Sequence, residues 1–130
     1  MQLTHINPDS LHKTPVFSQA VKVEGAAAML YIGGQNSTMP DGSVVGEDVA
    51  SQTEQALRNV LEVLKSVGAT QEQVAKLTIY VVQGQDIHDA FAASQKVWGM
   101  HPTAITVLIV AGLAIPGALV EIEAVCALDE

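Results

Sequence analysis

Hydrophobic and polar positions change their period along this chain, and the changes mark out strands and helices. Over residues 17–23 mostly apolar odd-numbered positions alternate with small or polar even-numbered ones, which predicts a half-buried strand. Glu24-Gly25 indicates a turn, and residues 29–32 indicate a second strand. We expect these two strands to pair as a hairpin.

Two longer segments have the three- and four-residue spacing of amphipathic helices. Asp48 is the expected N-cap of the first helix and Gly68 lies just past its end, while Asp86 and Gly99 bound the second. The apolar face of the first helix consists of Val49, Thr53, Ala56, Leu57, Val60, Leu64 and Val67. The second face consists of Ile87, Ala90, Ser94, Val97 and two aromatic residues expected in the core, Phe91 and Trp98.

Three further apolar segments complete the pattern, at residues 74–82, 103–110 and 118–127, and all three are predicted strands. The order strand, strand, helix, strand, helix, strand, strand predicts an α+β fold with one mixed sheet and both helices on one face. The strands are apolar enough that the other face is also expected to be buried, by association of subunits. A length of 130 residues fits a single domain, residues 1–130.

Composition narrows the possible partners. Hydrophobic residues make up 48% of the chain, which is ample for a globular core. Charged residues make up only 15%, which is low for a monomer and favours a surface partly covered by partner subunits. A net charge of −8 argues against binding to nucleic acid or to an anionic membrane. No signal-peptide pattern or apolar run of about 18 residues is present, so we expect a cytoplasmic location. The four histidines lack metal-ligand spacing, and the lone Cys126 is expected to pack as a small apolar side chain.

Five short motifs follow one another from Pro15 to Val125. They are Phe17-Ser18-Gln19-Ala20-Val21, Tyr31-Ile32-Gly33-Gly34-Gln35, Gln52-Thr53-x-Gln55-Ala56-Leu57-x-Asn59, Val74-x-Lys76-x-Thr78-Ile79-Tyr80 and Pro116-Gly117-Ala118-Leu119-Val120-Glu121-Ile122-Glu123-Ala124. In this order and spacing they resemble the reactive intermediate deaminase (Rid, or YjgF-like) family. The resemblance implies a chorismate-mutase-like fold, a homotrimer with a barrel-like core, and a small-molecule cleft at each subunit interface. It also implies hydrolysis of 2-enamines and 2-imines to 2-oxo acids and ammonia, without a cofactor.

The resemblance further assigns roles to individual residues. Glu121 is the expected catalytic residue, which orients the attacking water. The family's active members bind the substrate carboxylate with an arginine, and a bidentate pair of this kind is geometrically specific. The remaining cleft residues implied here are Phe17, Gly33, Gly34, Ile105, Thr106 and Val107.

The arginine position is occupied by Ile105, with the following hydroxyl residue kept as Thr106. An isoleucine cannot form an ion pair, so a bound 2-imino acid would place its carboxylate against apolar surface at a large free-energy cost. Phe17 stands where active members usually have tyrosine, and Phe91 stands about where a polar residue is often found. All three departures replace polar by apolar groups. We hypothesise a pocket for a neutral or less anionic ligand.

Several candidates have simpler interpretations. Glu123 is also consistent with a structural ion-pair partner, and Gly33-Gly34 with a strand end or bulge. His101 precedes the strand that contains Ile105, and it is either an acid, base or anion contact or a surface histidine. Lys76 belongs to another predicted strand, so the pattern places it away from Ile105. Three functions stay open: a cofactor-free imine or enamine hydrolase, a non-catalytic binding or regulatory trimer, and an endoribonuclease. The acidic charge disfavours the last of these.

Overall fold

Four strands form a mixed sheet in the computed structural model, which describes residues 1–130. They are β3 (Ala28–Gln35), β4 (Val74–Val82), β5 (Ala104–Val110) and β6 (Val120–Leu128), and their order across the sheet is β3-β6-β4-β5. Strands β4 and β5 are parallel, whereas β6 runs antiparallel to both β3 and β4. Strand β5 is therefore an edge strand.

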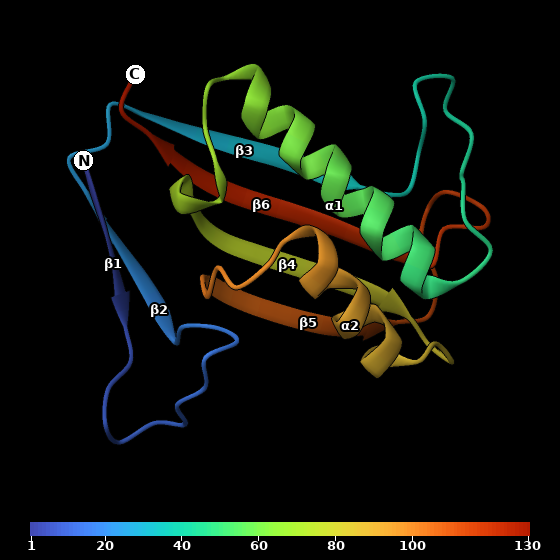
Figure 1. Cartoon of the computed structure of the whole chain (residues 1–130), viewed down its shortest axis with the longest axis horizontal. Helices are drawn as coiled ribbons and strands as arrows, with labels where there is room; N and C mark the ends of the chain where they lie inside the picture. The colour runs from blue at the N-terminus through green and yellow to red at the C-terminus, as the bar shows by residue number, and fades with distance from the viewer.

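Both helices cover the same face of this sheet (Figure 1). They are α1 (Val49–Ser66) and α2 (Ile87–Val97), and the short 3-10 helix η1 (Gln71–Gln73) leads into β4. The expected N-caps are confirmed, because the Asp48 carboxylate accepts from Ser51 N and the Asp86 carboxylate from His88 N, each at 2.8 Å. The predicted α+β architecture is confirmed. None of the helices is long and apolar enough to cross a bilayer.

The core lies between α1 and the helix-facing row of β6. Successive side chains of a strand point to opposite faces, so this row takes every second residue. Its members, Val120, Ile122, Ala124 and Cys126, are all buried. The predicted face of α1 is buried as well, except Val67, which is exposed because the helix ends at Ser66.

The predicted face of α2 is confirmed only in part. Ala90 and Trp98 are buried, but Phe91 is 44% exposed and Ile87 is also exposed. The expectation that Phe91 lies in the core is therefore wrong. Helix α2 lies over β4 and the edge strand β5 (Figure 1), and no further strand extends the sheet beneath its outer side.

The predicted hairpin is wrong. Strand β2 (Ala20–Glu24) pairs with β1 (Gln2–Ile6), a strand that the pattern did not predict, and the two form a separate antiparallel sheet. Strand β3 pairs with β6 instead. In its place beside β6 and beneath α1, β3 buries Ile32 in the main core. A two-stranded ribbon of β2 and β3 would have no core in which to bury this side chain.

The sheet face opposite the helices, here called the open face, is uncovered in the single chain. Tyr31 projects from it and is 74% exposed. The β5 edge, on the other side of the sheet from β3, is apolar as well, since Val107, Leu108 and Ile109 are all exposed, Ile109 by 55%. An apolar edge strand of this kind is a site for association with another chain.

Gln52 fastens the start of α1 to the loop before β6. Its side-chain amide donates to Gly46 O at 3.1 Å and to Gly117 O at 2.9 Å, and its carbonyl accepts from Leu119 N at 2.8 Å. The side chain is only 2% exposed. These contacts hold the strand that contains Glu121 in place against α1.

Replacing Gln52 by leucine is expected to lower the free energy of unfolding by at least about 2 kcal/mol, because three backbone groups lose their partner. Chemical denaturation followed by circular dichroism measures the change. Gln83→Leu is the control, since Gln83 is exposed and its side chain makes no hydrogen bond, and it should change stability little. Equal stability of the two variants would contradict a structural role for Gln52.

Candidate functional site

Glu121 lies on β6 and points to the open face, because its neighbours Val120 and Ile122 are buried under the helices. Asn36 donates from Nδ2 to the Glu121 carboxylate at 3.2 Å and to Val120 O at 3.1 Å. Gly34 packs directly against the same carboxylate, since a Cβ built on Gly34 would lie 2.6 Å from Glu121 Cδ. The predicted residues Glu121 and Gly34 are therefore in contact.

A chain of amides connects Glu121 to helix α1. Gln55 donates to Asn59 Oδ1 at 2.9 Å, and Asn59 donates to the backbone carbonyls of Asn36 and Thr38 at 3.0 and 2.9 Å. Asn36 then holds the Glu121 carboxylate. This network fixes a rotamer of the glutamate that a strand alone would leave free.

Sequence reasoning missed this positioning role. Asn36 was not singled out, and Gln55 and Asn59 entered only as motif residues. The available signal was the four-residue spacing of Gln55 and Asn59, which places both on one side of a helix whose core face is apolar. A polar pair at that spacing indicates a contact with something other than the core.

Two further polar pairs line the open face. Tyr80 donates to Glu123 Oε1 at 2.5 Å, and this hydrogen bond raises the pKa of the Tyr80 phenol, helped by desolvation and by the charges of Glu123 and Glu121. Lys76 donates to Thr106 Oγ1 at 2.5 Å. The prediction that Lys76 lies away from the site strand is wrong, because β4 and β5 are adjacent. No carboxylate of the chain lies within ion-pair distance of Lys76.

An apolar cavity of about 410 Å³ opens on the helix side of the sheet. It brings together three predicted cleft residues, Phe17, Ile105 and Val107. Helix α2 contributes Phe91 and the segment after it contributes Trp98, so the exposed Phe91 has a cavity to line. The cavity is within the size range of small-molecule sites.

The predicted cleft residues therefore form two groups. Phe17, Ile105 and Val107 line the apolar cavity beneath α2. Gly33 lines a smaller hollow of about 300 Å³ on the open face, together with Tyr31, Lys76 and Glu123, and Gly34 and Glu121 lie on that face too. Thr106 joins this second group through Lys76. The sheet separates the groups, so one ligand cannot touch both within a single chain.

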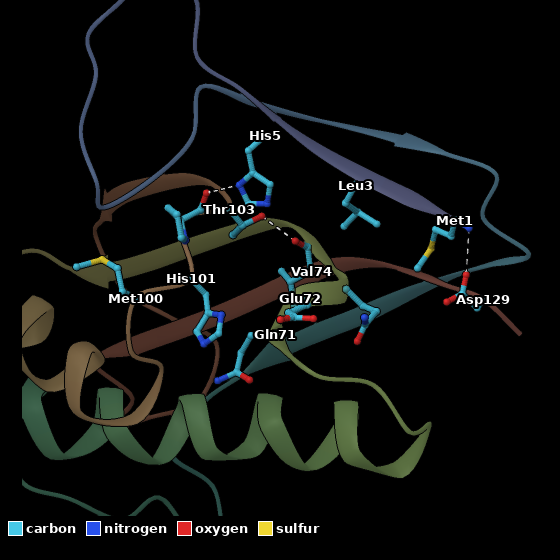
Figure 2. A pocket seen from close by; sticks show the side chains of 12 residues that line it. Met1, Leu3, His5, Gln71, Glu72, Val74, Met100, His101, Thr103 and Asp129 are labelled. Carbon is cyan, nitrogen blue, oxygen red and sulfur yellow. Dashed lines mark hydrogen bonds and ion pairs between the residues drawn. The ribbon is translucent and has the colours of Figure 1, made fainter.

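Another cavity, of about 430 Å³, lies between β1, the short helix η1 and the segment 100–103 before β5 (Figure 2). We call it the polar cavity. His5 lines it, and its Nδ1 lies 2.9 Å from Ser18 Oγ and 2.8 Å from Pro102 O. Glu72 and His101 also line it. No three histidine, cysteine, aspartate or glutamate side chains of the chain converge in a metal-binding arrangement.

Cys126 is confirmed as a packing residue. It is fully buried in the core row of β6, and this burial raises the pKa of its thiol to about 11. Since the thiolate is the nucleophilic form, Cys126 is unsuited to covalent catalysis near neutral pH.

Comparison with known proteins identifies the family. The model of the family described as Endoribonuclease L-PSP matches residues 8–128. The crystal structure of YyfB from Yersinia pestis, described as a member of the conserved Rid protein family, superposes with a TM-score of 0.86 at 34% identity and covers 98% of this chain and 100% of YyfB. This chain belongs to the Rid family.

Two curated relatives match a smaller share of the chain than YyfB does. The Arabidopsis thaliana protein named Reactive Intermediate Deaminase A, chloroplastic, is 32% identical over 113 residues, which is 86% of this chain and 58% of that protein. Protein mmf1, mitochondrial, from Schizosaccharomyces pombe is 33% identical over 95 residues, which is 73% of this chain and 54% of mmf1. The matched region thus spans little more than half of each relative.

Proposed function

We propose that this Rid-family protein is a homotrimer that hydrolyses imines or enamines, without a cofactor, at sites shared between neighbouring subunits. The observation that supports this most strongly is the division of the cleft residues. Glu121 lies on the open face, and Ile105 lies in the apolar cavity on the other side of the sheet. A single site that uses both groups requires two copies of the chain.

The uncovered surfaces agree with such an assembly. The open face exposes Tyr31, and the β5 edge exposes Val107 and Ile109. Closed homo-oligomers bury surfaces of this kind against an identical chain. Packing the β5 edge and its apolar cavity against the open face of a neighbour would bring Ile105 of one copy toward Glu121 of the next.

The proposed chemistry assigns the proton transfers to Glu121. An enamine first becomes an imine when its β-carbon gains a proton and its nitrogen loses one. On the imine, the carboxylate takes a proton from water as the water oxygen bonds to the C=N carbon, and the proton passes to nitrogen. The second water proton follows when the C–N bond breaks, which leaves a carbonyl compound and ammonia or an amine. Asn36 keeps one carboxylate oxygen in place, so the other is available to the water.

The proposed substrate differs from a 2-imino acid. The apolar cavity has Ile105 where a carboxylate anchor is expected and Phe17 beside it, and no Lys or Arg lines its wall. Burying a carboxylate there without a partner would cost several kcal/mol. We therefore propose imines or enamines whose buried part is uncharged.

A second candidate function is a non-catalytic binding or regulatory trimer. Ile105 favours it, since loss of the anchor removes the interaction by which the family's usual substrate is held. Glu121 is retained and its carboxylate is hydrogen-bonded by Asn36, which Asn59 holds in turn, and this favours the enzyme. Endoribonuclease activity, as in the description of the family model, is disfavoured by the net charge of −8.

The test combines assembly with turnover. Light scattering after gel filtration is expected to give three times the mass of the chain. A panel of neutral aliphatic and aromatic imines, generated in solution, is expected to include compounds that the wild type hydrolyses faster than buffer, with release of amine as the readout. Glu121→Gln should lower kcat/KM by roughly 10²-fold or more, as expected for loss of a general base.

Glu123→Gln is the matched control, because Glu123 lies two residues away on the same strand but is bound by Tyr80. It should retain most of the activity. A wild type that binds imines without turnover would favour the binding trimer, and equal losses in the two variants would contradict the role given to Glu121.

A further inference from the structure

His101 lies between two cavities. Its side chain lines the apolar cavity on one side and the polar cavity on the other, where Figure 2 shows the imidazole next to Gln71. It is half-buried, and neither ring nitrogen has a hydrogen-bond partner in the chain. This contrasts with His5, whose Nδ1 is bonded to Pro102 O.

Polar groups are scarce on the wall of the apolar cavity. Ser94 lines it, but its hydroxyl donates to Phe91 O at 2.6 Å within the helix. Gln95 of the same helix also lines it with an uncharged amide. His101 is the one titratable side chain on this wall, which otherwise consists mainly of aliphatic and aromatic groups. A few polar groups in an apolar pocket determine ligand orientation and specificity.

We propose that His101 binds the polar group of an uncharged ligand whose apolar body fills this cavity. The ligand class is a small aromatic or branched aliphatic compound with one amide, ester or similar hydrogen-bonding group in the position where a 2-imino acid has its carboxylate. This inference rests on the proposed function for the place of the site, and it adds the binding residue and the ligand chemistry.

The charges around His101 favour a neutral ligand over an anion. On the polar-cavity side, η1 presents Glu72 and the segment after β6 presents Asp129. Strand β1 presents His5 and the Met1 amino group, and that amino group is already paired with Asp129 at 3.4 Å. The remaining unpaired charge facing this side is the Glu72 carboxylate, which would repel a carboxylate bound to His101.

Trp98 provides a direct measure of binding. It is the only tryptophan of the chain, it lines the apolar cavity, and it is 6% exposed. Its indole N–H has no hydrogen-bond partner. A ligand that fills the cavity therefore changes the surroundings of the single fluorophore, so intrinsic fluorescence titration reports occupancy without any need for turnover.

The probes are phenylacetamide and phenylacetate, which have nearly the same shape and differ in charge. The wild type is expected to bind phenylacetamide at least 10-fold more tightly than phenylacetate. His101→Phe keeps a planar ring but removes both nitrogens, and it should weaken phenylacetamide binding roughly 5- to 10-fold, as expected for one hydrogen bond. His101→Gln keeps a donor and an acceptor and should retain part of the affinity.

The control is His88→Phe, because His88 is exposed on α2 and lines neither cavity, and it should bind phenylacetamide like the wild type. Unchanged or tighter binding by His101→Phe would overturn the proposal, since an apolar ring would then serve as well as the imidazole. Preference of the wild type for phenylacetate, or no response to either probe, would overturn it too. Binding through His101 with no imine turnover would contradict only the proposed hydrolase function.

Discussion

Replacing Gly34 by alanine is expected to remove most of the hydrolase activity while leaving the fold stable. The new Cβ would lie 2.6 Å from Glu121 Cδ, 2.7 Å from Oε2 and 2.8 Å from Cγ. Distances this short force the glutamate side chain to leave its position beside Asn36. The side chain is flexible, so the change costs little stability, but a misplaced general base loses roughly 10²-fold in kcat/KM.

Gly33→Ala is a matched control for this substitution. Gly33 is the preceding residue of β3, and a Cβ built there meets nothing within 4 Å. Neither glycine has a positive φ that would exclude alanine. We expect the Gly33 variant to keep near-wild-type activity in the imine assay and both variants to unfold at similar denaturant concentrations. Full activity of Gly34→Ala would contradict the placement of Glu121 at the reacting water.

Restoring a cation at position 105 is expected to change the substrate class. Ile105 lines the apolar cavity beside Phe17, so an arginine there would place its guanidinium where a substrate carboxylate needs a partner. A bidentate pair of this kind, partly shielded from water, is strong and specific. We expect Ile105→Arg to raise kcat/KM for a 2-imino acid by roughly 10²-fold and to lower it for neutral imines, because the cation must be desolvated in their complexes.

The measurement uses 2-iminobutanoate formed in solution, with a neutral imine of similar size as the comparison. Ile105→Met changes the shape of the side chain without adding charge, and it should leave the preference for neutral imines in place. Rapid wild-type hydrolysis of 2-iminobutanoate would contradict the altered specificity proposed for this cavity. An inactive but folded Ile105→Arg variant would contradict the assignment of position 105 to the carboxylate end of the site.

Local patterns were sufficient for most of the secondary structure. Asp48 and Asp86 cap their helices as predicted, because capping depends only on a side chain and the backbone a few residues away. The buried face of α1 followed from its spacing for the same reason. Phe91 shows the limit of that argument, since its position on the apolar side of α2 did not reveal that the sheet ends beneath it.

Strand pairing was not accessible in the same way. The turn at Gly25 correctly marked a change of direction. Whether β2 then pairs with β3 depends on which other strands each of them can pair with. Strand β3 pairs with β6, almost 100 residues later, and so reaches the core, while β2 pairs with β1. Such pairing is decided by total burial over the whole chain, which no local window contains.

By itself, the sequence determined the two helices, the strands of the main sheet, the family resemblance and the identity of the residues at the proposed site, including the apolar Ile105 in place of a cation. Only the tertiary structure showed that Glu121 is held by Asn36 and packed against Gly34, that Lys76 contacts Thr106, and that His101 separates two cavities. Residue types and periodicity depend on neighbours in the chain. Contacts across a sheet depend on register and on which face each strand turns to the helices, and these are properties of the packed molecule.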